Sequence, residues 1–572
     1  MNQITASLLE DYAKLHELPK DEELGSKFEK FSAYSVIRKI YGQEFDTELV
    51  EIGGGLDTGI DSIGILVNGV LVNTIEEIND LKERNNYLDV TYILIQSKIS
   101  ESFETDKIAT FCRGVEDFFL DNIGLKCNDE ILAKKDLHKE IMKHAVDLLK
   151  NPKLALYYVC TGHWKDEYTD QKSVIDTTVN KLRDASLFSN ISYKLYGADE
   201  INSLYKETRS NLSVQIEFES KATLPKGIPN VQSAYIGILP FSEFKKLIVD
   251  DDGYVRGVFE DNIRDFQDFS NPVNQKINET LAGESYKQFP LLNNGVTIVS
   301  QQIQELGNTM VLRGYQIVNG CQTSNVLARY IEEERLSNLS IPVKIIVTSD
   351  DATKNCITLA TNSQTPVKRE QLAASSQFQK NLEDYYNSQD MGVKLVYERR
   401  TNQYASSEVP KTRIITVPNQ IKAFASMFLR RPHRVTSYYG ELIKNLGKTD
   451  AEIFNPEHQQ LTYYLAGLTL YRLESLFRSG GIDTSNKKLR FFILMVFLLS
   501  IVPEKFDRND LMNSKQNAKK LQPLVNVLSN AERTNKLLQD AVKQILQTIS
   551  PINKEMLKIG STTDSLVALF ND

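Results

Sequence analysis

Three side chains in the first hundred residues have the types and spacing that hydrolysis of a phosphodiester requires. Asp61 follows a glycine-rich turn, and Gln96 and Lys98 lie two positions apart at the end of an apolar stretch. Carboxylate and amide oxygens bind hard cations such as Mg²⁺ or Mn²⁺. A nearby lysine orients water or neutralises charge on the phosphate. We therefore expect a metal-dependent phosphodiesterase site built on these three residues.

A hairpin and a third strand are expected to position this trio. Ile60–Val67 and Val70–Asn73 are strand-like and are joined by the tight-turn dipeptide Asn68-Gly69. Val90–Lys98 predicts the third strand. Because alternate residues of a strand face the same side, its last polar residues can converge with the aspartate at the head of the hairpin.

These residues, in this order of elements, resemble the PD-(D/E)XK, restriction-endonuclease-like nucleases. The match is to the Mrr-like variant, in which Gln replaces the acidic residue of the second motif. The resemblance implies that Asp61 and Gln96 ligate Mg²⁺ or Mn²⁺, and that Lys98 acts on the attacking water or on the phosphate.

The same resemblance implies a helix before the hairpin with a glutamate that faces the metal. The amphipathic segment 24–40 predicts this helix, and Glu29 is the equivalent glutamate and a further metal ligand. The helix after the lysine strand is expected over Glu104–Leu120. Asp57 lies four residues before Asp61 and is a second candidate, but Asp61 begins the strand.

The pattern also has a non-catalytic interpretation. An aspartate in a glycine-rich turn and a lysine at the end of a strand occur in ordinary folds. A neutral glutamine binds a metal less strongly than a carboxylate does. A nuclease-derived fold that binds nucleic acid or a phage component, and acts through partner proteins, is therefore the alternative to an enzyme.

Length and composition indicate a multi-domain α/β protein of 572 residues with a net charge of −8. No basic segment followed by an apolar run begins the chain, so we expect no signal peptide and a cytoplasmic location. The longest apolar run, Phe491–Val502, is too short to span a membrane and predicts a buried helix. The five cysteines are scattered, which argues against a disulfide framework. Twelve basic against six acidic residues between Lys368 and Arg434 are compatible with a phosphate-binding face.

The order of predicted elements divides the chain into four parts. Residues 1–125 form the nuclease-like α/β/α module, and 126–210 continue it as an α/β connector. Residues 211–417 form a central α+β domain, because short strands there alternate with polar turns. Residues 418–572 form a C-terminal α-helical domain.

The central part carries several unusual strings in a fixed order, listed here from the N-terminal side: NIRDFQ, LLNNGVTIV, QIVNGCQTSNVL, TNSQTPV and YERR. These strings resemble the AIPR family, named for abortive-infection phage resistance proteins of bacteria. The resemblance implies a role in defence against phage or foreign DNA, but it does not imply a particular reaction.

Polar residues at the strand ends of this central part predict a ligand pocket. The turn Asn319-Gly320 is expected to precede a helix that runs to about Arg335 and is capped by Thr323 or Ser324, which would form an anion site. The ligand would be a nucleotide or nucleic acid; the alternative is that these side chains only satisfy turns. The candidate side chains are Arg264, Asn293, Asn294, Asn319, Gln322, Thr323, Asn362, Gln364, Arg399 and Arg400.

Together these observations predict a metal-dependent DNA endonuclease whose central domain binds nucleic acid or nucleotide and regulates cleavage. RNA is the alternative substrate. A P-loop NTPase is excluded, because the sequence contains no Walker-type Gly-x-x-x-x-Gly-Lys-Ser/Thr string. We also expect a homo-oligomer and restraint by a regulatory protein or a phage-derived trigger, since an unregulated nuclease would harm its host.

Overall fold

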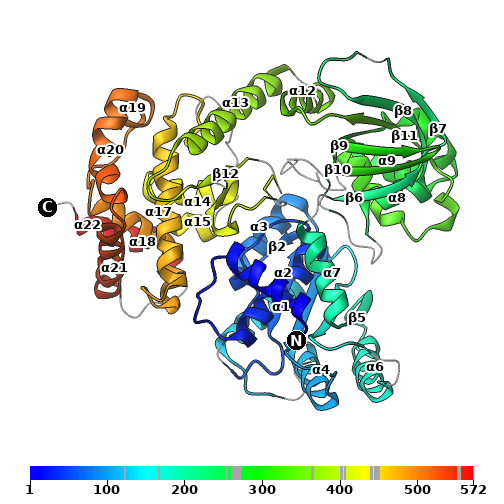
Figure 1. Ribbon diagram of the computed structural model, residues 1–572, viewed down its shortest axis with the longest axis horizontal. Coiled ribbons are helices and arrows are strands. Elements are labelled where there is room, and N and C mark those ends of the chain that lie inside the picture. Colours follow the sequence, from blue (N-terminus) through cyan, green and yellow to red (C-terminus); the bar gives the residue numbers. More distant parts are fainter. Residues whose placement is uncertain are drawn as a thin grey trace. The chain divides into compact units, whose positions relative to one another are not determined.

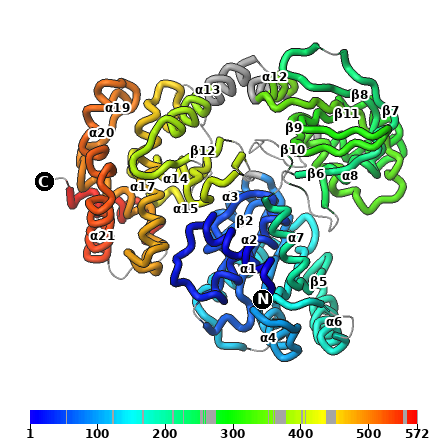
Figure 2. The backbone as a smooth tube through the Cα atoms, viewed as in Figure 1, coloured from blue at the N-terminus to red at the C-terminus, as the bar shows by residue number. Residues whose placement is uncertain are grey.

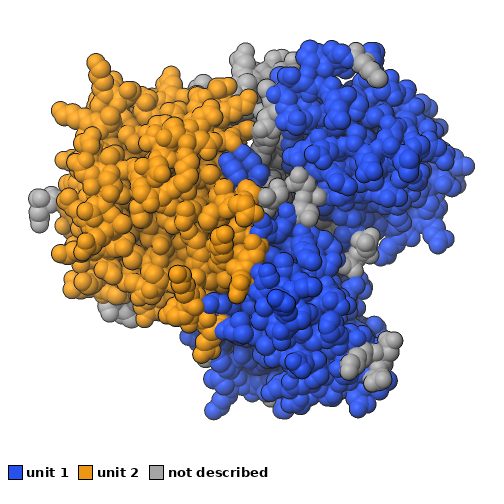
Figure 3. Space-filling view, in the orientation of Figure 1, with its two compact units in different colours: residues 1–9, 24–364, 400–406 blue, residues 10–23, 365–399, 407–572 orange. Residues whose placement is uncertain are grey.

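The backbone, traced from N- to C-terminus in Figure 2, falls into two compact units that are coloured in Figure 3 and are each described separately. Unit 1 comprises residues 1–9, 24–364 and 400–406, and unit 2 comprises 10–23, 365–399 and 407–572. The boundary expected at 417/418 falls inside unit 2. The structure is a computed structural model that describes residues 1–53, 55–120, 124–164, 168–209, 212–225, 227–250, 256, 258, 272–362, 366–399, 403–404, 407–437, 442, 451–549 and 556–570.

A five-stranded mixed sheet, in the order β2-β1-β3-β4-β5, forms the centre of the N-terminal part of unit 1 (Figure 1). β1 pairs antiparallel with both β2 and β3, whereas β3, β4 and β5 are parallel. Residues beyond 125 therefore supply two strands of the same sheet. The strands are β1 Ser62–Val67, β2 Val70–Leu71, β3 Val90–Lys98, β4 Lys153–Cys160 and β5 Asn190–Tyr196.

Helices cover both faces of this sheet. Ile37 of α2 lies over Gly64 of β1, which pairs with Ile93 of β3. Tyr92 precedes Ile93 in β3, so its side chain points to the opposite face of the sheet. There it packs against Phe119 of α4, with ring centroids 5.2 Å apart. α2 therefore covers one face and α4 the other. The helices of residues 1–209 are α1 Gln3–Leu15, α2 Leu24–Tyr41, α3 Ile75–Asn85, α4 Thr105–Leu120, α5 Asp129–Lys143, α6 Thr169–Asp184 and α7 Ala198–Arg209.

The expected hairpin, third strand and flanking helices are present. Val67 pairs with Val70, and both Asn68 and Gly69 have positive φ, as a two-residue hairpin turn requires. The stretch between the hairpin and the third strand, for which no element is expected from the sequence, forms α3. Thr74 and Glu77 make a capping box at its start, which stabilises the first turn.

A second sheet of six strands, in the order β6-β10-β9-β11-β8-β7, forms the other part of unit 1. Only the β9–β11 pair is parallel. Its elements are β6 Ser213–Glu217, β7 Ser220–Thr223, β8 Ser233–Pro240, α8 Phe241–Ile248, α9 Pro272–Ala282, α10 Phe289–Leu292, β9 Val296–Leu306, β10 Thr309–Asn319, α11 Cys321–Leu327, β11 Ser340–Val347 and α12 Asp351–Asn362. The chain is thus mixed α/β with separate sheets.

Unit 2 is mainly helical. The expected core helix is confirmed, because α18 is buried over almost its whole length. Tyr463 and Tyr464 of α17 are also fully buried, as core residues are. The described elements are α13 Pro366–Ser388, β12 Val396–Glu398, β13 Ile414–Thr416, α14 Val417–Met427, α15 Pro432–Ser437, α17 Gln460–Arg478, α18 Arg490–Leu499, α19 Arg508–Met512, α20 Ser514–Leu528, α21 Ala531–Thr548 and α22 Gly560–Ala568.

Two global expectations can be compared with the fold directly. None of the helices in the described part of the chain combines the length and the apolar character that crossing a bilayer requires. All five cysteines are free thiols.

Candidate active site

The pairing of β1 with β3 places the start of one strand beside the end of the other. Asp61 immediately precedes β1, and its backbone N–H donates to the carbonyl of Ile95 at 2.9 Å. Ser62 is the register partner of Ile95. The antiparallel register therefore fixes Asp61 next to the last residues of β3.

The Asp61 carboxylate is the centre of the resulting cluster. Its Oδ2 accepts hydrogen bonds from Gln96 Nε2 at 2.8 Å and from the backbone N–H of Ser97 at 2.6 Å. Lys98 Nζ lies 3.6 Å from Oδ1. The structure thus brings Asp61 together with Gln96 and Lys98, although Asp61 lies at least 35 residues before them in the chain.

Burial sets the electrostatics of this cluster. Asp61 is 4% exposed, and burial raises the pKa of its carboxyl to about 6, although Lys98 and the Ser97 N–H act in the opposite direction. Burial, followed by the charge of Asp61, raises the pKa of Glu29 on α2 to about 7, whereas Lys98 lowers it. The charges of Asp61 and Lys98 therefore both act on the ionisation of Glu29.

The turn before β1 distinguishes the two candidate aspartates. Asp57 Oδ1 accepts a hydrogen bond from the N–H of Gly59 at 2.7 Å, so this carboxylate holds the turn. Gly59 has a φ of +80°, and its neighbour Thr58 places a carbonyl against Gly114 of α4. Asp61, rather than Asp57, is the carboxylate that contacts Gln96 and Lys98.

Ser97 belongs to this cluster but was not singled out in the sequence. Strand alternation places its side chain on the face opposite to Gln96, so the rule that residues i and i+2 share a face selects Gln96 and Lys98 but not Ser97. Its backbone N–H nevertheless makes the shortest hydrogen bond to Asp61. Its Oγ is buried and makes no hydrogen bond within the described part of the chain. No side-chain pattern could have identified a backbone donor.

The donor set of the cluster suits a hard divalent cation. Asp61 and Glu29 supply carboxylate oxygens, and the amide oxygen of Gln96 is the atom that a cation would use. Mg²⁺ commonly takes one or two carboxylates and keeps several waters. Among the described residues, no group of three or more His, Cys, Asp or Glu side chains is placed to hold a metal. The fit therefore rests on two carboxylates and one amide.

The central polar residues behave differently from this cluster. Asn293 Nδ2 donates to Thr323 Oγ1 at 3.0 Å, and Asn293 Oδ1 accepts from the N–H of Gly295. Asn319 Nδ2 donates to the carbonyl of Thr361 at 2.9 Å. These three side chains are thus engaged in holding turns and neighbouring elements, while Asn294 is exposed.

The helix after the Asn319-Gly320 turn is shorter than expected. α11 begins at Cys321 and ends at Leu327, and its N-cap Gly320 has a φ of +88°. The expected cap by Thr323 or Ser324 is wrong, because neither side chain bonds the first turn; Ser324 Oγ instead donates to the Gly320 carbonyl. A helix of seven residues provides no extended dipole for an anion.

The remaining candidates are dispersed. Gln322 is half-buried on α11. Arg399 lies in unit 2, where its Nε donates to Glu383 Oε2 at 2.9 Å in a largely buried ion pair. Arg264, Gln364, Arg400 and the side chain of Asn362 lie outside the described residues.

Comparison with known proteins gives one match. No curated protein and no solved structure matches this chain. Residues 259–540 match the model of a family described as AIPR protein. This range contains all five strings on which the sequence resemblance rests. The match supports the resemblance over this part of the chain, and we call residues 259–540 the AIPR region.

Proposed function

We propose that this protein is a metal-dependent phosphodiesterase that cuts DNA in defence against phage. The observation that carries the proposal is the convergence of Asp61, Gln96 and Lys98 at one end of the mixed sheet, with Glu29 near enough for the charges of Asp61 and Lys98 to act on it. A buried carboxylate next to a lysine is costly for a purely structural module. The AIPR region supports the defence role, because that family is named for abortive-infection phage resistance.

Each side chain has a role that its position suits. Asp61, Gln96 and Glu29 would hold Mg²⁺ or Mn²⁺, which when bound polarises the phosphate and lowers the pKa of water. Lys98 is 36% exposed, so its ammonium group reaches substrate while Asp61 stays sealed. There it orients the attacking water or neutralises charge on the phosphate.

The raised pKa values couple cation binding to proton release. Glu29, with a pKa of about 7, is partly protonated at neutral pH, and a carboxylate must lose its proton to bind a cation. Cation affinity should therefore rise with pH between about 6 and 8. This coupling belongs to the same proposal and depends on Glu29 as a ligand.

A second candidate is a binding protein that senses nucleic acid or a phage component and acts through partners. Gln96 favours this candidate, because a neutral amide is a weaker ligand than a carboxylate. Among the described residues, no three His, Cys, Asp or Glu side chains are grouped so that they could hold a metal, which points the same way.

Cleavage assays with matched variants test the proposal. Wild type, Asp61→Ala and Lys98→Ala would be compared on plasmid, phage and single-stranded substrates with Mg²⁺ or Mn²⁺. Asp136→Ala and Lys139→Ala are the controls, because this exposed pair on α5 undergoes the same chemical changes far from the cluster in sequence. We expect cutting by the wild type and both controls, and its loss in the two site variants.

The same variants should be compared for phage protection in cells. If Asp61→Ala and Lys98→Ala protect as well as wild type does, the cluster is scaffold and the nuclease proposal fails. If wild type cuts nothing in vitro but both variants lose protection, the binding-protein candidate is favoured, with the cluster as its functional surface.

A further inference from the structure

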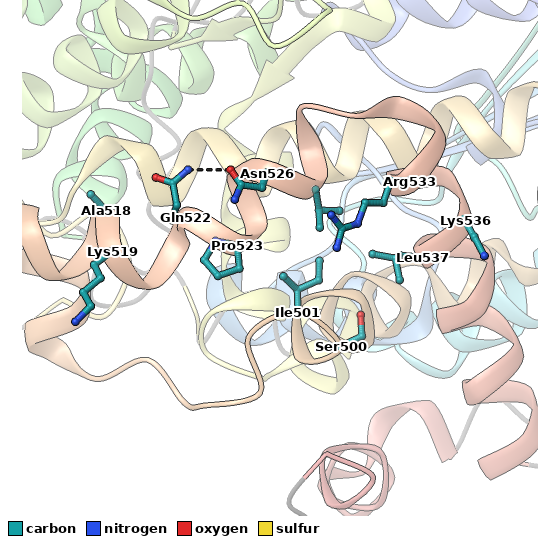
Figure 4. Close-up of a pocket in the computed structure, with 11 residues that line it drawn as sticks. Ser500, Ile501, Ala518, Lys519, Gln522, Pro523, Asn526, Arg533, Lys536 and Leu537 are labelled. Atoms are coloured by element: carbon teal, nitrogen blue, oxygen red, sulfur yellow. Dashed lines mark hydrogen bonds between the residues drawn. The ribbon is translucent and has the colours of Figure 1, made fainter.

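A basic pocket in unit 2 lies far along the sequence from the candidate active site. The cavity has a volume of about 990 Å³ and is formed by the end of α18 together with α20 and α21 (Figure 4). Lys519, Arg533 and Lys536 line it. Figure 4 shows Lys519 and Lys536 at opposite ends and Arg533 extending toward Ile501. None of its eleven described lining residues is acidic.

The three cations of this basic pocket are available for a ligand. Within the described part of the chain, no ion pair or hydrogen bond engages the side chains of Lys519, Arg533 and Lys536, although the backbone N–H of Arg533 donates to Asn530 Oδ1. The adjacent Lys520 differs, because its Nζ donates to Asp510 and lies over the ring of Phe506. α20 contains three lysines and no Asp or Glu. A locally cationic surface in a chain of net charge −8 points to an anionic partner.

The other lining groups narrow the kind of anion. Gln522 Nε2 donates to Asn526 Oδ1 at 2.9 Å, so the floor presents amides between the cations. Pro523 has no N–H and leaves the carbonyl of Lys519 without its usual helical partner. None of the lining residues is aromatic. Base recognition in single strands or nucleotides normally uses aromatic stacking, so this pocket suits phosphates rather than bases.

We propose that the basic pocket of Lys519, Arg533 and Lys536 binds backbone phosphates of DNA without regard to sequence. A single free phosphate would need donors that converge on one point, whereas these cations are spread over two helices. This inference rests on the proposed function, since it identifies a second surface by which the nuclease holds its substrate. The pocket lies inside the AIPR region.

The salt dependence of DNA binding tests this proposal. A triple variant, Lys519→Gln, Arg533→Gln and Lys536→Gln, would be measured with a labelled duplex in EDTA between about 50 and 200 mM salt. Each lost phosphate contact lowers the slope of log K against log salt by about 0.9. We expect a slope smaller by about two to three units, with equal effects on duplexes of different sequence.

A matched control removes the same charge elsewhere. Lys139→Gln, Lys143→Gln and Lys543→Gln replace three exposed lysines that already have carboxylate partners. This control should retain nearly the wild-type slope. Thermal unfolding should be unchanged in both triple variants, because every replaced side chain is exposed.

The outcomes separate this inference from the nuclease proposal. If both triple variants have the same slope and affinity, the pocket does not bind DNA and the inference is overturned. If ATP binds the wild type through these three side chains, while the salt slope of DNA binding is the same in wild type and the pocket variant, the pocket is a nucleotide site and the DNA inference is overturned. If wild type binds DNA through the pocket but never cuts, the inference stands and the nuclease proposal fails.

Discussion

Asp61 is a buried carboxylate, and its hydrogen-bond donors and the nearby lysine offset only part of the cost of burying its negative charge. Two hydrogen bonds reach the same oxygen, and the nearest ammonium is 3.6 Å from the other one. Burial still raises its pKa to about 6. Burying such a charge lowers the folding stability of the protein. A bound cation would stabilise the carboxylate and offset this loss. Stability in the absence of metal is therefore a readout of the site.

Glu29 gives the clearest test of this cost. Its pKa is about 4.5 in the unfolded chain and about 7 in the folded one, so the folded state holds more protons between these values. The contribution of Glu29 to the free energy of unfolding is therefore greatest below about pH 4.5 and falls as pH rises toward 7. Glu29→Gln removes this loss. We expect the variant to match wild type near pH 4 and to be more stable above pH 7, by urea unfolding in EDTA.

Glu207→Gln is the control for this measurement, because Glu207 is exposed on α7, which lies in the same unit as Glu29. It should follow the wild-type pH profile. Added Mg²⁺ should stabilise wild type more than Glu29→Gln. A stability difference between Glu29→Gln and wild type that is the same at every pH would contradict the argument.

At the residue scale, the sequence predicted the cluster better than the central pocket. Strand period is a local rule that puts Gln96 and Lys98 on one face of β3, and the antiparallel pairing of β1 with β3 then brings both to Asp61. The partners of Asn293 and Asn319 are set by tertiary contacts with Thr323 and the Thr361 carbonyl. A polar side chain at a strand end looks the same in sequence whether it serves a ligand or a turn.

At the element scale, the predictable features were those with a period or a turn signal. β3 has the expected bounds, because the mainly apolar, β-branched and aromatic stretch Val90–Ile95 is buried in the sheet and continues into its polar end. α3 is not predicted, because its apolar residues are few, although the Thr74-x-x-Glu77 spacing of its capping box is present in the sequence. α11 was expected to be longer, since nothing local shows where packing ends a helix.

The turn before β1 packs closely against α4, with the Thr58 carbonyl next to Gly114. A Cβ added at Gly114 would lie 2.2 Å from the Thr58 carbonyl oxygen, which is backbone and cannot move aside cheaply. We expect Gly114→Ala to destabilise the protein by about 1–3 kcal/mol, as overpacking does, and to reduce cleavage. Denaturant unfolding and cleavage assays measure the two effects.

Gly25→Ala is the matched control at the start of α2. An added Cβ there meets nothing within 4 Å, so this change should be neutral or slightly stabilising. If Gly114→Ala were as stable and active as Gly25→Ala, the turn would not depend on its contact with α4.

At the scale of the whole chain, separate cores define the architecture. One buried cluster contains residues between 52 and 195, a second between 214 and 347, and a third between 378 and 566. The third belongs to unit 2, which also includes residues 10–23 from the N-terminal end. There Glu17 Oε1 accepts from Arg413 Nε at 2.8 Å. From the sequence these residues are expected in the first domain, because no local rule predicts a contact between residues 396 positions apart.

Separate cores predict separate unfolding transitions. Leu94 of β3 and Leu465 of α17 are both fully buried, the first in unit 1 and the second in unit 2. Leu→Ala at such positions costs about 2.7–5 kcal/mol, because the lost burial is compounded by the cavity left behind. We expect calorimetry to resolve at least two transitions, with Leu94→Ala and Leu465→Ala lowering different ones. Mg²⁺ should raise only the transition that Leu94→Ala lowers, since the candidate ligands lie in unit 1. One transition that both variants shift equally would show that the units unfold as a single cooperative structure.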